Sequence, residues 1–61
     1  MRERLRMARE KQGKTQQQVA DLANISLKSY QRIEKGDQVP SVSVAILIAK
    51  AVKSTVEKLF G

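Results

Sequence analysis

The side chains best suited to chemistry in this chain are cations and amides between residues 16 and 35. On a helical period of about 3.6 residues, Lys28, Gln31 and Arg32 fall on one side of a helix. Lysine and arginine can donate hydrogen bonds to guanine O6 and N7, glutamine can pair with adenine, and an exposed leucine such as Leu27 can pack on a thymine methyl group. These side chains therefore suit the base edges in the major groove of DNA.

Catalysis and metal binding have much weaker support in the composition. The chain has no His and no Cys, and its six Asp and Glu residues are scattered without the spacing of a metal site. An active site would have to be built from Ser, Lys or isolated carboxylates. We therefore predict that the protein is not an enzyme and binds no metal, cofactor or small-molecule substrate.

Apolar residues at helical spacings place the polar side chains on two short helices joined by a tight turn. Ala20 is small enough for the two helices to approach closely, and Asn24 tolerates the left-handed backbone that a sharp turn can require. The pattern is typical of a helix-turn-helix. The residues predicted to face inward are Val19, Ala20, Ala23, Ile25, Tyr30 and Ile33.

Capping residues and glycines divide the chain into five predicted helices. Thr15 and Gln18 predict a capping box, and Gly13 and Gly36 stand where helices commonly end. We expect an all-α fold, a single domain over residues 1–61, with the second and third helices as the helix-turn-helix. Two further caps, Ser26 and Ser41, begin the third and fourth helices, and Thr55 begins the last. The predicted helices span residues 2–12, 16–23, 27–35, 42–52 and 56–60.

The fourth predicted helix, residues 42–52, is the most apolar segment. Its β-branched residues could suggest a strand, but its length, its N-cap and the preceding Pro40 favour a helix. Its predicted apolar face consists of Val42, Ala45, Ile46, Ala49 and Val52. The outer helices are predicted to add Leu5, Ala8, Leu59 and Phe60 to the core.

The charge of the chain favours a polyanionic partner. Its formal net charge is +6, and residues 1–14 hold six bases against two acids. Such a surface attracts phosphate polyanions, and a merely solvated basic face is the alternative. The apolar run at residues 44–49 is far shorter than the ~20 residues of a membrane span, and the first residues lack the apolar stretch of a signal peptide. We expect a cytoplasmic protein with no membrane partner.

Several short motifs resemble those of the Cro and phage-repressor type of helix-turn-helix domain, the XRE family. The motifs are Arg9 with Gly13, TQQQVA from Thr15, RIEKG from Arg32, and VPS from Val39. The resemblance extends from Leu5 to Phe60 and implies a compact five-helix repressor-like fold. It also implies a sequence-specific transcriptional repressor that binds double-stranded DNA.

The resemblance assigns roles to residues of the two central helices. Leu27, Lys28 and Arg32 match the base-reading positions, and Gln16 matches a phosphate-binding glutamine at a helix N-terminus that suits an anion. The alternatives are packing for Leu27, solvation for the two cations, and a helix-surface or capping role for Gln17. Gln31 could face a phosphate, a base or water. The predicted base-reading residues are Leu27, Lys28, Gln31 and Arg32. The predicted phosphate contacts are Arg9, Thr15, Gln16, Gln17, Ser26 and Lys35.

Arg9 and Glu34 resemble the ion pair that links the first and third helices in this family. A guanidinium can bond a carboxylate twice and keep a donor for a phosphate. Because one such domain makes few base contacts, we expect a weak homodimer on a palindromic operator with half-sites about 34 Å apart, and a monomer is the alternative. The predicted dimer contacts are Ser54, Thr55, Val56 and Lys58.

The chain departs from the family pattern at a few positions. Lys14 stands at a usually apolar position, Asn24 replaces the commoner glycine, and Tyr30 replaces an aliphatic residue. Lys53 and Ser54 replace a usual glycine and apolar pair. The alternative function is a protein-interaction module, an antitoxin or adaptor whose basic surface binds an acidic partner. The cations of the third helix favour DNA over that alternative.

Overall fold

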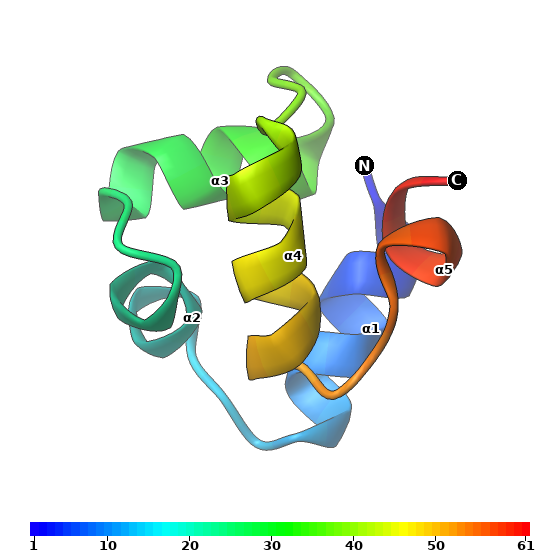
Figure 1. The fold of residues 1–61 in the computed structure, drawn as a ribbon. Helices are drawn as coiled ribbons and strands as arrows, with labels where there is room; N and C mark the ends of the chain where they lie inside the picture. The colour runs from blue at the N-terminus through cyan, green and yellow to red at the C-terminus, as the bar shows by residue number, and fades with distance from the viewer.

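The predicted helices are all present in the computed structural model, which describes residues 1–61 and contains no strand (Figure 1). Their ends lie within one residue of the predicted ends, because the residues that flank a helix serve as its caps and leave the helical backbone conformation. The prediction of an all-α fold with five helices is confirmed. The helices are α1 (Glu3–Lys11), α2 (Gln16–Leu22), α3 (Leu27–Lys35), α4 (Val42–Ala51) and α5 (Val56–Phe60).

Side-chain hydroxyl groups cap the N-termini of α2 to α5. Thr15 Oγ1 accepts a hydrogen bond from the backbone N–H of Gln18 at 3.1 Å, and Gln18 Oε1 accepts one from the N–H of Thr15 at 2.8 Å. This reciprocal pair is the predicted capping box. Each cap satisfies an N–H group that the helix itself leaves unpaired, which stabilises the protein by about 1 kcal/mol. The caps of the last three helices are Ser26, Ser41 and Thr55.

Two non-glycine residues have a left-handed backbone conformation. Asn24, between α2 and α3, has φ of 57°, as its place in the tight turn predicted. Lys53, between α4 and α5, has φ of 54°. Asparagine is tolerated in this conformation, whereas a lysine with a Cβ atom and no short polar side chain is strained there. The turn into α5 therefore carries a cost that a glycine would avoid.

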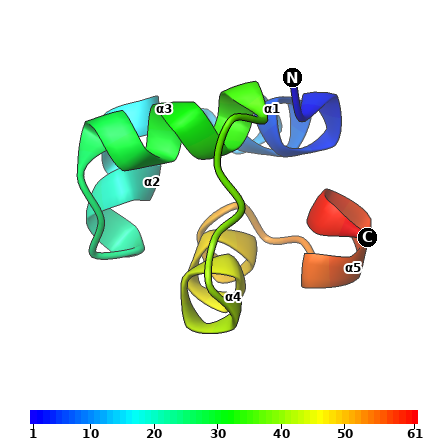
Figure 2. The same ribbon diagram turned by 90° about the horizontal axis from the view of Figure 1, so that it is seen from above.

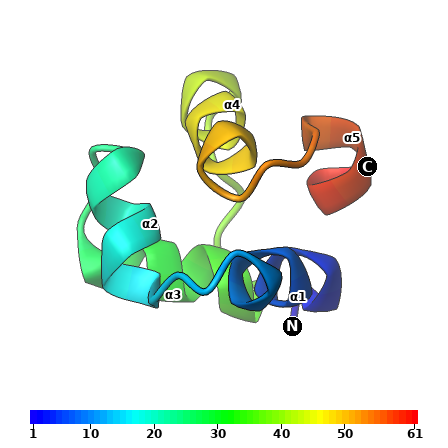
Figure 3. The ribbon, with the colours of Figure 1, turned by 90° about the horizontal axis from the view of Figure 1, so that it is seen from below.

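The helices enclose a shared apolar core. α2 packs against α3 and α4, α1 packs against α3 and α5, and α4 packs against α5. Figures 2 and 3 show α1 and α3 along one side of the molecule and α4 and α5 on the other. Burial of the apolar side chains between them is the main stabilising contribution. The buried core consists of Leu5, Val19, Ala20, Ala23, Tyr30, Ile33, Ile48, Ala49, Val52 and Leu59.

The predicted apolar face of α4 is wrong at two positions. Val42 is 76% exposed and Ile46 is 42% exposed, whereas Ile48 is completely buried. Nearly every residue of α4 is apolar, so the sequence pattern fits several faces, and packing against α2 and α5 selects one of them. The longest helix is α4, with 10 residues. None of the helices is long and apolar enough to cross a membrane.

Candidate nucleic-acid interface

The outer face of α3 carries exposed cations and an amide. Tyr30 and Ile33 are buried against the core, so the opposite side of the helix faces solvent with Lys28, Gln31 and Arg32. Figure 2 shows α3 along an edge of the molecule. Neither cation of this face takes part in an intramolecular ion pair. Both are therefore free to donate to an external acceptor.

The residues at the two ends of this face differ from the exposed, unpaired cations between them. Leu27 is half-buried in the first turn of α3, and Lys35 is exposed at the last turn with its Nζ 3.8 Å from Asp37 Oδ2. An exposed pair at that distance restrains the lysine little. The hydroxyl of Ser26 accepts from the N–H of Ser29, which leaves its own proton available to a phosphate.

The N-terminus of α2 lies next to this face, because Gln16 in its first turn accepts a hydrogen bond from Gln31 of α3. Thr15 is exposed and caps the helix, and Gln16 is half-buried. Gln17 Nε2 donates to Asp21 Oδ1 at 2.8 Å along its own helix, which is the helix-surface arrangement. The first N–H groups of a helix have no partner within it and attract anions.

A buried carboxylate, that of Glu34, joins α3 to α1. Arg9 Nε donates to Glu34 Oε2 at 2.9 Å and Arg9 Nη2 donates to Oε1 at 3.0 Å, so the ion pair is bidentate. Arg9 Nη1 also donates to the carbonyl of Lys14 at 3.0 Å. Only 2% of Glu34 is exposed, so the pair belongs mainly to the interior. The sequence resemblance pointed to the same two residues.

Two further side chains donate to Glu34. The hydroxyl of Tyr30 donates to Oε2 at 2.6 Å, and Gln16 Nε2 donates to Oε1 at 3.3 Å. Burial by itself would raise the pKa of Glu34, but the hydrogen bonds from Arg9 and Tyr30 outweigh it and hold that pKa below its ordinary value. Burial, and then the bond to Glu34, raise the pKa of Tyr30.

Sequence reasoning gave Tyr30 only a packing role and missed its hydroxyl. The spacing of four residues between Tyr30 and Glu34 is the signal that could have found it, because side chains one helical turn apart meet on the same face. The substitution of a tyrosine for the usual aliphatic residue thus adds a polar partner for a buried charge.

The hydrogen bonds continue from Glu34 to the surface. Gln31 Nε2 donates to Gln16 Oε1 at 3.2 Å, so Gln16 connects the buried carboxylate with a predicted base-reading residue. An ionised carboxylate only accepts hydrogen bonds, and this polarity orients both amides. Gln16, Gln31 and Glu34 line a surface hollow of about 280 Å³ together with Met1 and Lys35.

Arg2 is a second residue that sequence reasoning missed. Its Nη1 donates to the carbonyl of Ile33 at 2.5 Å and to that of Gln38 at 3.1 Å, and its guanidinium lies 5.3 Å from the centroid of the Phe60 ring. A cation near the C-terminus of α3 is favourable because carbonyl groups there have no helical partner. Arg2 thus links the C-terminal end of α3 to α5 through its hydrogen bond to Ile33 and its contact with the Phe60 ring. No pattern in the sequence distinguished it from the other basic residues of the N-terminal segment.

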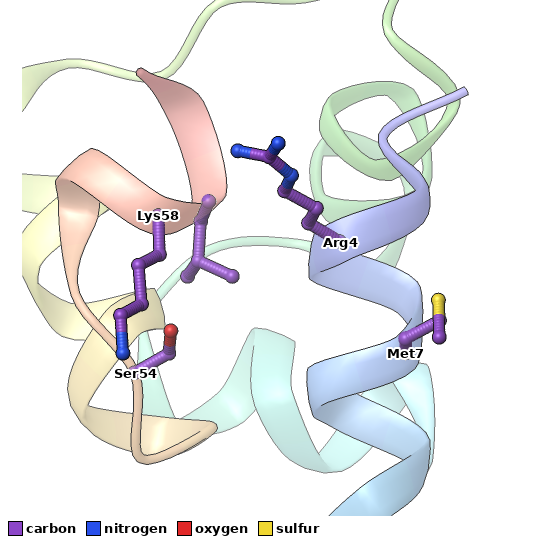
Figure 4. A pocket seen from close by; sticks show the side chains of 5 residues that line it. Arg4, Met7, Ser54 and Lys58 are labelled. Carbon is purple, nitrogen blue, oxygen red and sulfur yellow. The ribbon is translucent and has the colours of Figure 1, made fainter.

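The predicted dimer contacts surround the start of α5, on the side of the molecule away from α2 (Figure 1). Thr55 caps α5, and Val56 is half-buried against the core. Lys58 is exposed and Ser54 is half-buried. Figure 4 shows the last two beside a pocket between α5 and α1. The pocket is lined by Arg4, Met7, Ser54, Lys58 and Leu59.

Two short helices joined through a left-handed turn, with a buried inner face and a cationic outer face, define a helix-turn-helix domain. The model of the helix-turn-helix family matches residues 5–59. The chain belongs to this family, the XRE-type helix-turn-helix family of DNA-binding transcriptional regulators.

Three curated relatives support the family membership. The transcriptional repressor RstR of the cryptic phage CTXphi, from Vibrio cholerae, is 38% identical over 61 residues, which cover 100% of this chain and 54% of that protein. The competence pilus inhibition repressor of Acinetobacter baylyi is 36% identical over 56 residues, 92% of this chain and 51% of that protein. An HTH-type transcriptional regulatory protein of Pyrococcus furiosus is 48% identical over 44 residues, 72% of this chain and 14% of that protein.

The chain spans about half the length of the first two relatives and a smaller part of the third. No solved structure matches the chain significantly.

Proposed function

We propose that this chain binds double-stranded DNA sequence-specifically as the reading unit of a transcriptional repressor, with α3 in the major groove. The observation that carries the proposal is the exposure of Lys28 and Arg32 without intramolecular partners on the face of α3 opposite its buried residues. In a helix-turn-helix the second helix enters the major groove and the first crosses the backbone. The names of RstR and of the Acinetobacter relative support repression as the outcome.

The base-reading set has a specific chemistry for each member. Lys28 and Arg32 donate to guanine O6 and N7, and Gln31 presents its free amide atoms to an adenine. Its bond to Gln16 supports this role because it restrains the amide before DNA arrives. Leu27, half-buried at the start of α3, packs its exposed edge on a thymine methyl group.

The phosphate contacts position α3 without reading sequence. Gln16 binds one phosphate and joins it to the hydrogen bonds around Glu34. Ser26 donates its free hydroxyl proton to a neighbouring phosphate. Arg9 contributes a donor that its ion pair leaves free. The remaining proposed phosphate contacts are Thr15, Gln17 and Lys35.

The proposed functional form is a weak homodimer on a palindromic operator. A single α3 reads few base pairs, and two copies related by a twofold axis read half-sites about 34 Å apart. The surface at the start of α5 is the proposed contact, and the exposure of Thr55 and Lys58 supports that choice. The contact residues are Ser54, Thr55, Val56 and Lys58.

Selection of bound duplexes from a random pool tests this function. We expect an enriched half-site that occurs twice with twofold symmetry, and a 2:1 complex with the selected duplex in ultracentrifugation. Enrichment of one unrepeated site with a 1:1 complex would refute the homodimer, but it would still support sequence-specific binding of DNA. Failure to bind any duplex at low salt would refute DNA binding itself and favour the adaptor.

A further inference from the structure

A second cationic surface lies at the other end of the fold from α3. In Figure 1, α3 is at the top, and the α1–α2 connection and the end of α4 are at the bottom. Three lysines surround a hollow of about 300 Å³ there, with apolar side chains between them. We call this surface the lysine hollow, and it consists of Lys14, Leu22, Leu47, Lys50, Ala51 and Lys53.

The lysines of this hollow have no intramolecular ion-pair partner. One acidic residue, Asp21, lines an adjoining hollow together with Lys14; its carboxylate accepts a hydrogen bond from the neutral amide of Gln17 and keeps its negative charge. Like charges that share a concave surface repel one another and raise the local concentration of anions. The three lysines outnumber the single carboxylate of Asp21, so this surface keeps a net positive charge.

The floor of the lysine hollow is apolar. Leu22 is 53% exposed at the end of α2, and Leu47 and Ala51 are half-buried on α4. A single exposed leucine is ordinary on a protein surface. Leu22, however, lines the same hollow as two further apolar side chains and three lysines. A ligand that fits this surface combines negative charge with an apolar group.

Two of the three lysines are departures from the family pattern found in the sequence. Lys14 replaces a usually apolar residue, and Lys53 replaces a usual glycine. Lys53 also has φ of 54°, a conformation that glycine adopts without strain. Strain of this kind points to a function for the residue that carries it.

We propose that the lysine hollow binds an acidic segment of a partner protein, whose carboxylates pair with the lysines and whose apolar side chain covers Leu22. Lys50 and Lys53, in α4 and just after it, lie away from a duplex bound along α3, whereas Lys14 directly precedes the proposed phosphate contact Thr15. A symmetric contact between the hollows of two copies of this chain would bring lysines against lysines. The proposal goes beyond DNA binding and does not depend on it.

Titration of the isotopically labelled protein with a synthetic peptide of repeating Glu-Glu-Leu tests the proposal. Amide chemical shifts measured at low salt identify the residues that the peptide contacts. We expect the largest shifts at Lys14, Leu22, Lys50 and Lys53. The same peptide with Gln in place of Glu, and with Ser in place of Leu, should bind more weakly, because each lacks one half of the proposed recognition.

Lys53→Gly is the informative variant, since it removes the amine and relieves the left-handed strain. We expect its melting temperature to rise while its peptide affinity falls roughly two- to fivefold, the effect of one partly exposed ion pair. Lys11→Ala is the matched control, because Lys11 is an exposed lysine of α1 without an ion pair, lies outside the hollow, and its removal should leave the peptide affinity nearly unchanged.

Three results would overturn the proposal. The first is peptide-induced shifts that map to the cations of α3 instead of the lysine hollow. The second is an equal loss of affinity in Lys53→Gly and Lys11→Ala, which would mean unspecific attraction to net charge. The third is duplex DNA shifting the hollow more strongly than the acidic peptide, which would make this surface part of the DNA contact.

Discussion

At the scale of single residues, Glu34 accepts hydrogen bonds from three side chains, and each comes from a different helix. Arg9 belongs to α1, Gln16 to α2 and Tyr30 to α3. A buried charge with complete partners is tolerated, whereas the loss of one partner leaves it uncompensated in a low-dielectric interior. The network therefore affects stability and the placement of α3 together.

Removal of the arginine partner should show this coupling. We predict that Arg9→Ala lowers the free energy of unfolding by about 3–5 kcal/mol, because it leaves the carboxylate of Glu34 buried and unpaired. DNA affinity should fall as well. Arg6→Ala is the matched control on the same helix, where the ion pairs with Glu3 and Glu10 are exposed and the effect should be much smaller.

Chemical denaturation of both variants measures the difference. An unchanged free energy of unfolding in Arg9→Ala with a selective loss of DNA binding would contradict the structural role.

The same carboxylate predicts how stability depends on pH. The pKa of Glu34 is lower in the folded protein than its ordinary value of 4.5. Its contribution to stability is therefore fully present above that value and is lost as the pH falls through the folded pKa. We expect the melting temperature to be level between neutral pH and about pH 5 and to decrease at lower pH. Glu34→Gln should show a smaller acid-induced decrease, and an equal decrease would assign the effect to other carboxylates.

The residue-level features differ in how far sequence could predict them. The pairing of Arg9 with Glu34 followed from a family resemblance, and exposure of Lys28 and Arg32 followed from helical periodicity. The hydroxyl of Tyr30 was missed because an aromatic residue on an apolar face fits a packing role equally well. Contacts between distant segments, such as Arg2 with the end of α3, leave no local pattern at all.

At the scale of helices, local chemistry determined the ends, and tertiary packing determined the faces. The capping box at Thr15 and the left-handed turn at Asn24 depend on neighbouring residues alone, and both were predictable. The face of α4 was not, because its side chains are apolar on all sides and only the neighbouring helices distinguish them. A uniformly apolar helix carries little information on its own orientation.

Two isoleucines of α4 test the face that packing selected. Ile48 is completely buried, and Ile46 is 42% exposed. We predict that Ile48→Ala lowers the free energy of unfolding by about 2–5 kcal/mol, because it removes buried methyl groups and leaves a cavity. Ile46→Ala should cost less than about 1 kcal/mol. Equal losses in denaturant titrations would mean that α4 is rotated from the orientation described above.

At the scale of the whole molecule, positive charge is present on two separate surfaces. The net charge of +6 promotes encounter with any polyanion and does not by itself select a partner. α3 and the end of α4 lie at opposite ends of the fold, so the proposed DNA contact and the proposed acidic partner use different surfaces (Figure 1). In the proposals above, the selectivity of each surface comes from its other side chains, the amide of Gln31 on α3 and the leucines in the hollow.

If α3 reads base pairs, two of its cations should have different effects on binding. Arg32 should affect the preference for a base sequence, and Lys35 should affect the affinity for every duplex. Affinities of Arg32→Ala and Lys35→Ala for the selected operator and for random duplex, measured over a range of salt concentrations, test this central claim most directly. We predict that Arg32→Ala weakens operator binding by about 1–3 kcal/mol and relaxes the preference at one base pair. Lys35→Ala should weaken both duplexes alike and lower the salt slope by about one unit. Equal losses on operator and random DNA for both variants would contradict the assignment of α3 as the reading helix.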